Sequence, residues 1–366
     1  MTDAAASSSR RRMEAVRRHL LPRPPPVLSL NQLSAPEAGQ SPMIIGGMVL
    51  DIHAKPSVPP HPGTTVPGMV KYIGGGVARN IAECMAKLGT QPLMISAIGD
   101  DMAGNFLLKY WKLAGLCTDV GILQVPDVTT PVVSNVFDGN GELFAGVASV
   151  QAVETFLTPS WIYQFYRRIS TAPLLMLDAN LSPESLQAAC KIAYESGVPV
   201  LFEPVSVVKS SRITPIAEHG IKLLLVTLGS NGVFICCREH VNFMKDQKRC
   251  KVTPFSTQLL EKLEGCSLSS MPVNLSREGS SRTCVFHLPA TSASVVSLTG
   301  AGDCLVGGFL SSLCGGLDIM QSVAVGIAVA KASVESEANI PANFSAASIA
   351  DEARRTFLSA RQIWCQ

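Results

Sequence analysis

The stretch Leu298-Thr299-Gly300-Ala301-Gly302-Asp303-Cys304 decides how the rest of this chain is interpreted. An apolar pattern with helical spacing follows it, so the two glycines stand where a helix begins. Unpaired N–H groups and the positive end of the helix dipole favour an anion there, and glycine lets a phosphate approach the backbone closely. Asp303 adds a carboxylate, which suits a general base that takes a proton from an attacking hydroxyl. The alternative is that Asp303 caps the helix and the glycines form a tight turn.

The composition of the 366 residues bounds the class of protein. A net charge of +2 gives no strong attraction to nucleic acid or to a membrane, so we expect neither as a partner. No apolar run is long enough to cross a bilayer. With 47% hydrophobic and 16% charged residues, the chain can bury a large core as one big α/β domain or two smaller ones. The eleven cysteines are scattered without paired CxxC motifs, which predicts reduced thiols rather than zinc or disulfides.

Residues 1–42 differ in composition from the rest of the chain. They hold Arg10-Arg11-Arg12 and Pro24-Pro25-Pro26, and we expect them to form a disordered tail. An Arg-rich, Ser-containing start also resembles a mitochondrial presequence, but Asp3 and Glu14 count against that alternative. We therefore expect a cytoplasmic protein, with the mitochondrion as the alternative.

Two further segments carry groups that could hold a sugar. The apolar run from Met43 to Leu50 predicts a buried parallel strand, and Asp51 follows at its carboxyl end, where α/β proteins place ligand-binding groups. A carboxylate there could bind two hydroxyls, or it could cap a turn. In the stretch from Gly74 to Ile81 the glycines allow a sugar to approach the backbone, and Asn80 could bind hydroxyls at the start of a helix. The third glycine of a dinucleotide fingerprint is missing, so NAD is not expected.

These stretches together resemble the PfkB/ribokinase family of sugar kinases. GGGVARNIAECMAKLG (Gly74 to Gly89) and SLTGAGDCLVGGFLSSL (Ser297 to Leu313) are similar to the two signatures of that family, and IGDD and TLGSNGV occur in the family's order. The resemblance covers about Met43 to Phe344. Within the family, GGMVLDI, LDANLSPESL and EPVSVVK look most like the kinases that act on pseudouridine.

The resemblance implies a fold and a reaction. The fold is a ribokinase-like, doubly wound α/β domain over residues 43–366, with a mostly parallel sheet flanked by helices and a small β lid. The reaction is transfer of the γ-phosphoryl group of ATP to a primary hydroxyl, with Mg²⁺ bridging the phosphates. The expected acceptor is the 5′-hydroxyl of a nucleoside, pseudouridine first. Ribose, another sugar or another nucleoside is the alternative, as is a ligand-binding form that has lost turnover.

The resemblance also assigns roles to residues. Asp303 matches the catalytic base, and the backbone of Gly300, Ala301 and Gly302 matches the anion hole. Sugar-contacting positions are matched by Asp51, Gly75, Gly76 and Asn80. Nucleotide-contacting positions are matched by Thr227, Gly229 and Gly232, and Asn339 opens a loop that often contacts adenine or ribose. Ser297 stands where many relatives carry Asp for a monovalent cation, so activation by such a cation is doubtful.

Three segments complete the expected layout. Residues of about 53–72 and 125–150 are predicted to form the lid, with a hairpin turn at Asp138-Gly139-Asn140-Gly141, and such lids can pair two protomers as a homodimer. Residues 238–290 are predicted to be a solvated surface insertion. Between residues 206 and 223 the chain is too short for the strand and helix that would carry the family's Asn-x-x-Glu motif, which organises magnesium. Glu203 could partly substitute as a metal-binding residue.

Overall fold

The computed structural model describes residues 41–61, 63–116, 120–138, 143–214, 220–238, 250, 253–263 and 283–365. The chain divides into two units, Met1–Pro36 and Glu37–Gln366, and all elements given below belong to the second. Apart from residues 41 and 42, the predicted tail lies outside the described residues. Within the described ranges, no helix combines the length and the apolar character needed to span a membrane.

A parallel sheet forms the centre of the second unit, in the order β5-β4-β1-β8-β9. Its strands are β1 (Met43–Ile45), β4 (Leu93–Gly99), β5 (Ile122–Val125), β8 (Leu175–Asp178) and β9 (Val200–Glu203). Every residue of β1, β4 and β8 is buried. Strands that are covered by helices on both faces read as continuous apolar runs, so the predicted strand after residue 42 is confirmed, although β1 ends at Ile45.

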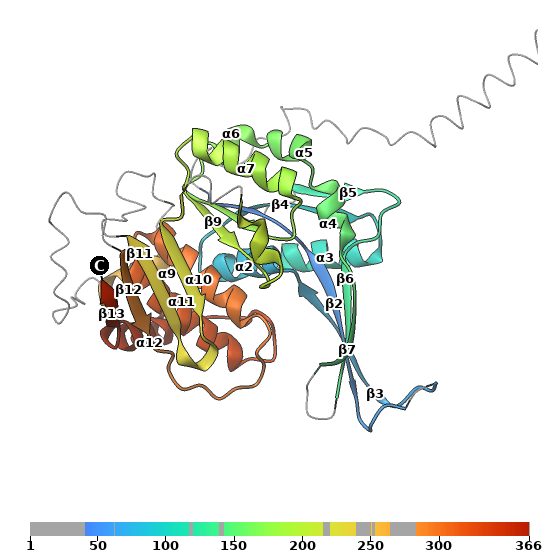
Figure 1. The fold of residues 1–366 in the computed structure, drawn as a ribbon. Helices are drawn as coiled ribbons and strands as arrows, with labels where there is room; N and C mark the ends of the chain where they lie inside the picture. Colours follow the sequence, from blue (N-terminus) through green and yellow to red (C-terminus); the bar gives the residue numbers. More distant parts are fainter. Residues whose placement is uncertain are drawn as a thin grey trace, which may run out of the picture. The chain divides into compact units, whose positions relative to one another are not determined.

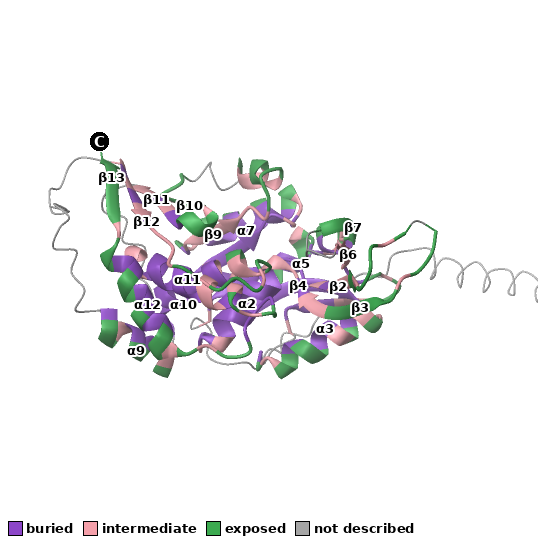
Figure 2. Ribbon diagram, turned by 90° about the horizontal axis from the view of Figure 1, so that it is seen from below, coloured by how far each residue is buried: buried purple, intermediate pink, exposed green. Residues whose placement is uncertain are grey.

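Helices cover the two faces of this sheet. On one side lie α2 (Val77–Lys87) and α3 (Met102–Leu113), and on the other lies α7 (Pro183–Glu195), with the short helices α4 (Gln151–Phe156), α5 (Pro159–Tyr163) and α6 (Tyr166–Ile169) nearby (Figures 1 and 2). Connections between parallel strands are right-handed. Helices therefore lie on one face of the sheet where successive strands are added in one direction, and on the other face where they are added in the opposite direction. The order reverses between β1 and β8, so the carboxyl ends of these two strands form the switch point where such sheets bind ligands.

A second sheet is antiparallel, in the order β10-β11-β12-β13. It contains β10 (Leu223–Thr227), β11 (Val233–Arg238), β12 (Thr283–Leu288) and β13 (Arg361–Cys365). The helices α10 (Ala301–Gly315), α11 (Ile319–Val334) and α12 (Ala346–Leu358) pack in series beside it, as the warm-coloured part of Figure 1 shows. Nearly all of α10 after its first turn is buried, and it also packs on α2 of the parallel sheet.

The two sheets are not joined by a strand in the described residues. Between β9 and β10, apart from residues 215–219, the chain forms only the 3-10 helix η2 (Lys209–Ile213). β9 pairs only with β8, and β10 pairs only with β11, so each has an unpaired edge within the described part of the chain. On β10, Leu224 and Val226 are 49% and 42% exposed. This is the place where the family resemblance implies a further strand and helix.

The third sheet is the lid, in the order β3-β2-β6-β7. Its strands are β2 (Val49–Pro56), β3 (Gly68–Gly75), β6 (Val132–Phe137) and β7 (Leu143–Ser149), which extend away from the parallel sheet (Figure 1). The first lid segment, formed by β2 and β3, starts earlier and ends later than the predicted 53–72. Val125, predicted in the lid, lies in β5 and pairs with β4 of the parallel sheet. Residues 139–142, most of the predicted hairpin turn, lie outside the described residues.

The predicted surface insertion of 238–290 is partly wrong. Residues 239–249, 251–252 and 264–282 lie outside the described residues, but the stretch also holds the helix α9 (Pro254–Leu263) and the strand β12. Leu259 and Leu263 of α9 are buried, and the helix packs on α10 and α12. The apolar face of α9 therefore belongs to the core rather than to a solvated loop.

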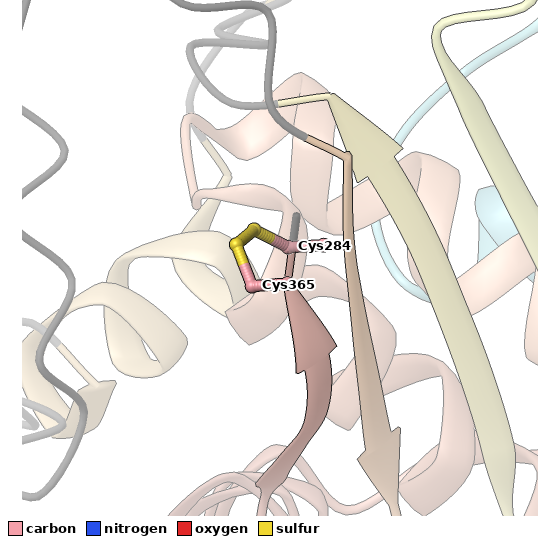
Figure 3. Close-up of a disulfide and its surroundings, with 2 residues drawn as sticks. All are labelled: Cys284 and Cys365. Carbon is pink, nitrogen blue, oxygen red and sulfur yellow. A yellow bond between two sulfur atoms is a disulfide. The ribbon is translucent and has the colours of Figure 1, made fainter.

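The expectation that all thiols are reduced is also corrected. Cys284 and Cys365 form a disulfide between β12 and β13 (Figure 3). The two residues are directly paired across the antiparallel strands, with their Cα atoms 4.1 Å apart. Strand register, which spacing in the sequence does not reveal, brings these two sulfurs together. The other described cysteines are free.

Candidate active site

The start of α10 has the backbone geometry expected of an anion site. Gly300 precedes the helix with a φ of 83°, and a Cβ at this position would lie 2.1 Å from the carbonyl oxygen of Asn339. Only glycine fits both the left-handed conformation and this contact. The N–H of Ala301 donates to the oxygen of Leu298 at 3.4 Å, whereas in the described part of the chain the N–H groups of Gly302 and Asp303 have no acceptor. A Cβ on Gly302 would meet no atom within 4 Å, so its backbone is open to a ligand.

Asp303 lies in the first turn of α10, where it faces other acids. Burial raises the pKa of its carboxyl to about 7; a hydrogen bond from Asn80 lowers it, and the charges of Glu203, Asp178 and Asp51 raise it further. The Asn80 Nδ2 group donates to Asp303 Oδ2 at 2.7 Å. This contact joins the two glycine-containing motifs, which are more than two hundred residues apart in the sequence. A carboxyl with a pKa near neutrality is suited to general-base chemistry.

Arg79 holds Asn80 in the orientation that reaches Asp303. Its Nη1 atom donates to Asn80 Oδ1 at 3.0 Å and to the carbonyl oxygen of Gly74 at 2.8 Å. Because the oxygen of the Asn80 amide is engaged, its NH₂ group is left to face Asp303. Arg79 is almost fully buried and is ion-paired with Glu83, whose other oxygen lies 2.7 Å from Lys87 Nζ. Arg79 was not among the predicted site residues, although its i, i+4 spacing to Glu83 indicated an ion pair on one helix.

Asp51 was expected at the carboxyl end of the first parallel strand, but that strand ends at Ile45 and Asp51 lies within the lid strand β2, facing the same region. Burial raises the pKa of its carboxyl to about 6, and the nearby Arg79 guanidinium opposes that shift. A Cβ on Gly75 would lie 2.0 Å from Asp51 Oδ2, so glycine makes room for this carboxylate. Gly76 has a φ of 96° and a Cβ there would lie 2.5 Å from the carbonyl oxygen of Gly47. Among the predicted sugar-contacting residues, the structure thus brings Asp51, Gly75, Gly76 and Asn80 into one neighbourhood.

Asp178 belongs to this neighbourhood but was not among the predicted site residues. It ends β8 and is fully buried. Its Oδ2 accepts from the N–H of Gly47 at 2.9 Å, and its Oδ1 accepts from the N–H of Asn180 at 2.8 Å. Burial raises the pKa of Asp178, with these two hydrogen bonds opposing. The available signal was the one used for Asp51, an acid at the carboxyl end of an apolar strand.

Glu203 ends β9, next to Asp178 in the strand register. Burial and the charge of Asp178 raise its pKa, while a hydrogen bond from the N–H of Val205 lowers it. The mutual repulsion of Glu203, Asp178 and Asp303 leaves negative charge that a cation would relieve. Within the described ranges, however, no group of three His, Cys, Asp or Glu is arranged to hold a metal ion by itself. This combination fits Mg²⁺, which commonly binds one or two carboxylates together with waters and phosphates.

The predicted nucleotide residues lie in two places. Thr227, Gly229 and Gly232 form the turn from β10 to β11, where the N–H of Leu228 donates to the oxygen of Gly232 at 2.8 Å. Within the described residues, no hydrogen bond connects this turn with Asp303 or Asn80. Asn339 is buried, and its carbonyl oxygen contacts the Gly300 backbone and accepts from Ser333 Oγ at 3.2 Å. Its Nδ2 atom has no protein partner in the described part of the chain.

This chain is similar to known kinases in sequence and in fold. The sequence profile of the pfkB family carbohydrate kinases matches residues 43–217 and 264–343. A pseudouridine kinase from Arabidopsis thaliana is 42% identical, over 88% of this chain and 98% of that protein. The pseudouridine kinase of Escherichia coli (strain K12) is 26% identical, over 77% of this chain and 86% of that protein. The structure of Arabidopsis thaliana ribokinase complexed with ribose and ATP has a TM-score of 0.63, with 18% identity and coverage of 86% of this chain and 99% of that chain.

The alignment to the plant relative is longer than this chain. It runs over 379 positions, more than the 366 residues of this chain. The plant protein therefore has residues that have no counterpart here.

Proposed function

This chain belongs to the pfkB family of carbohydrate kinases, and we propose that it transfers the γ-phosphoryl group of ATP to the 5′-hydroxyl of pseudouridine. The observation that carries the proposal is the contact between Asn80 and Asp303 at the glycine-lined start of α10. This contact supports a base of near-neutral pKa that lies between a sugar-binding motif and an anion site. The 42% identity to a pseudouridine kinase over most of both chains supports the choice of nucleoside.

The reaction requires a proton acceptor and a site for the transferred charge. Asp303 accepts the proton of the 5′-hydroxyl as its oxygen attacks the γ-phosphorus, the bond from that phosphorus to the bridging oxygen breaks, and ADP leaves. The free N–H groups of Gly302 and Asp303, with the dipole of α10, stabilise the negative charge on the phosphoryl oxygens. Gly300 and Ala301 shape the backbone that presents these groups.

The sugar is held on the opposite side of Asp303. Asp51 accepts hydrogen bonds from the ribose hydroxyls, and the absence of side chains at Gly75 and Gly76 lets the ring approach the backbone. Asn80 bridges the sugar and the base Asp303. The raised pKa of Asp51, about 6, leaves this group ionised at neutral pH and able to accept two hydroxyl protons.

The nucleotide contacts are the less constrained part of the proposal. Thr227, Gly229 and Gly232 would contact ATP from the β10–β11 turn, and Asn339 from behind the anion site. Glu203 would hold Mg²⁺ through water, and the ion when bound neutralises charge on the phosphates. The cytoplasm, with the mitochondrion as alternative, remains a prediction from the sequence.

A form that binds ligand without turnover is the second candidate. The open edges of β9 and β10 favour it, because the missing strand would have carried a magnesium-organising carboxylate. Mass spectrometry of products from a nucleoside and ribose mixture with ATP and Mg²⁺ decides between the candidates. We expect a mass increase of one phosphate on pseudouridine. Phosphorylation of ribose alone would make the chain a sugar kinase, and ligand binding without any product would favour the second candidate.

We also propose that two copies pair through their lids. The face of the lid sheet opposite to the one that carries Asp51, which we call its outer face, carries Val70, Tyr72 and Val147, which are 57%, 55% and 75% exposed. Apolar side chains at this exposure on one side of a small sheet indicate a surface that is covered in the functional state. A second copy supplies the same face, as an isologous interface requires.

A further inference from the structure

The segments LDANLSPESL (Leu177 to Leu186) and EPVSVVK (Glu203 to Lys209) contact each other at the carboxyl ends of β8 and β9. Asp178 and Glu203, which end the two strands, are paired in the strand register. Beyond the strands, Lys209 Nζ donates to Asn180 Oδ1 at 2.5 Å. A lysine thus lies at the edge of the sheet where the acidic residues of the site gather, and neither the base nor the backbone anion site uses it.

The chain after β9 is held in the position that presents this lysine. Arg212, in the 3-10 helix η2, donates from Nη1 to the carbonyl oxygens of Ala179 and Leu181 at 3.2 and 2.8 Å. Its Nη2 atom lies 3.1 Å from Glu154 Oε1. These contacts fasten η2 to the loop that follows β8, so the short connection toward β10 has a fixed place beside the site.

A strained turn connects β9 to Lys209. Val205 has a φ of 62°, a conformation that β-branched residues very rarely adopt. Its N–H donates to Glu203 Oε1 at 3.3 Å, so the carboxylate at the end of β9 stabilises the turn. Strained backbone persists where its surroundings enforce it, and it is concentrated at functional sites. The turn therefore indicates a functional constraint on the direction in which the chain leaves β9.

Lys209 brings a positive charge to the acidic residues around the base. Burial raises the pKa of Asp178, and the charge of Lys209 is among the effects that lower it. Burial also raises the pKa of Asp303, and the charge of Asp178 adds to that shift. Asp178 is therefore within electrostatic reach of both the lysine and the base. Because its two oxygens already accept the N–H groups of Gly47 and Asn180, the ammonium group is not consumed by an ion pair with it.

The ammonium group of Lys209 has donors to spare. It carries three N–H groups, and within the described ranges Asn180 Oδ1 is the one acceptor found for them. The side chain is partly buried, where a charge interacts more strongly than in bulk water. Lysine binds phosphate as a point charge. Two donors are thus left for an anion that enters beside Asp178 and Asp303.

We propose that Lys209 is a catalytic residue that donates to the γ-phosphate of ATP and neutralises its charge during transfer. This inference rests on the proposed kinase function and deepens it. The γ-phosphate is the group concerned because Asp178 links the lysine to Asp303, the base that acts at the reacting phosphorus. Lys209 also lies in the interval that lacks the strand with a magnesium-organising carboxylate, so it supplies positive charge to the phosphates where that carboxylate is absent. A nucleotide without a γ-phosphate should not depend on it.

The test compares nucleotides that differ in the third phosphate. We would measure the Kd of ADP and of a non-hydrolysable ATP analogue by calorimetry with Mg²⁺, and kcat with ATP and pseudouridine. For Lys209→Met we expect the Kd of the analogue to rise about tenfold and kcat to fall about 10- to 100-fold, as for a lost hydrogen bond from a charged group. The Kd of ADP should stay unchanged. Lys191→Met, which removes an exposed lysine from α7, is the matched control and should alter none of these values.

Two more variants separate the charge of Lys209 from its contact with Asn180. Lys209→Gln can still donate to Asn180 but is neutral, so it should behave like Lys209→Met. Lys209→Arg keeps the charge and should retain the preference of the wild type for the analogue over ADP, although its geometry differs. Full recovery in Lys209→Gln, or equal weakening of both nucleotides with a lower melting temperature, would make the residue structural and overturn the proposal.

The proposed function and this inference can fail separately. If the wild-type chain phosphorylates pseudouridine and Lys209→Met does so equally well, the role of Lys209 is refuted and the function stands. If the wild-type chain phosphorylates no nucleoside, the proposed function fails, and Lys209 is judged from the two Kd values. A selective loss of affinity for the analogue in Lys209→Met and Lys209→Gln would still support the contact, whereas unaltered affinity, or no binding of the analogue to the wild-type chain, would refute it.

Discussion

Replacing Asp303 by asparagine tests the active site at its centre. The change keeps the shape of the side chain and one oxygen that can accept from Asn80 Nδ2. In the wild-type chain this donor lies 2.7 Å from Asp303 Oδ2. It removes the only group at the start of α10 that could take a proton from the substrate within the described residues. General bases contribute about 10²- to 10⁴-fold to a rate, so we expect kcat to fall by that factor. The KM for ATP should change little, because the backbone N–H groups remain.

The same substitution should stabilise the fold at alkaline pH. A pKa raised from 3.8 to about 7 means that the folded state disfavours the ionised carboxyl by on the order of 4 kcal/mol. Between pH 4 and pH 7 the folded state therefore binds more protons than the unfolded state, and wild-type stability falls as the pH rises. The neutral amide escapes this penalty. We expect Asp303→Asn to be more stable by about 1 to 3 kcal/mol at pH 8, since relaxation recovers part of the cost, and no more stable than wild type at pH 4.

Two measurements check this reasoning together. The first is the pH dependence of kcat/KM, which for the wild-type chain should rise about tenfold per pH unit below the pKa of about 7 and level off near pH 8. The second is thermal unfolding of wild type and Asp303→Asn at pH 4 and pH 8. A variant that retains wild-type kcat would refute the assignment of the base. A variant that is less stable than wild type at pH 8 would refute the account of a buried, repelled carboxylate.

Three further predictions concern the surroundings of this group. Gly300→Ala forces a positive φ on alanine and a Cβ 2.1 Å from the Asn339 carbonyl oxygen, so it should lower the unfolding free energy by about 1–3 kcal/mol. Gly302→Ala places its Cβ in open space, so it should keep wild-type stability but raise the KM for ATP. Equal melting temperatures for the two variants would contradict this packing argument. Arg79→Lys keeps the charge but loses the forked donor, so the KM for the nucleoside should rise about tenfold with the KM for ATP unchanged, and a parallel rise in both would indicate general misfolding. Val147→Asp should convert a dimer into a monomer in sedimentation analysis, and an unchanged sedimentation coefficient would rule out pairing through the outer lid face.

The sequence predicted the local parts of this protein well. Gly300 was expected at a helix start, and it precedes α10 with a positive φ value. The helix after Gly76 was expected to start near Asn80, but α2 already begins at Val77. The parallel sheet flanked by helices and the β lid were expected from the family resemblance, and both are present. The small number of residues between β9 and β10 was sufficient to predict that no further strand and helix fit there. Such features depend on neighbours in the sequence or on chain length, so spacing and residue type are sufficient to indicate them.

Other parts depended on partners that are distant in the sequence. The place of Asp178 at the end of an apolar strand was visible, but its role depends on a hydrogen bond from the N–H of Gly47, 131 residues away. Residues 254–263 looked like a surface insertion until their apolar face met α10 and α12. The pairing of Cys284 with Cys365 required the register of two strands.

The residues of this kinase were thus determined by the sequence motifs, whereas their chemistry was decided by the tertiary structure. A Gly-x-Gly-Asp at a helix start predicts an anion site and a carboxylate wherever it occurs. Only folding buries Asp303 beside Glu203, Asp178 and Asp51 and turns Asn80 toward it, which moves its pKa to about 7. The burial of a carboxyl and the repulsion from other charges depend on all the residues that surround it in space. Those residues come from segments that are far apart in the sequence, so no local motif predicts them.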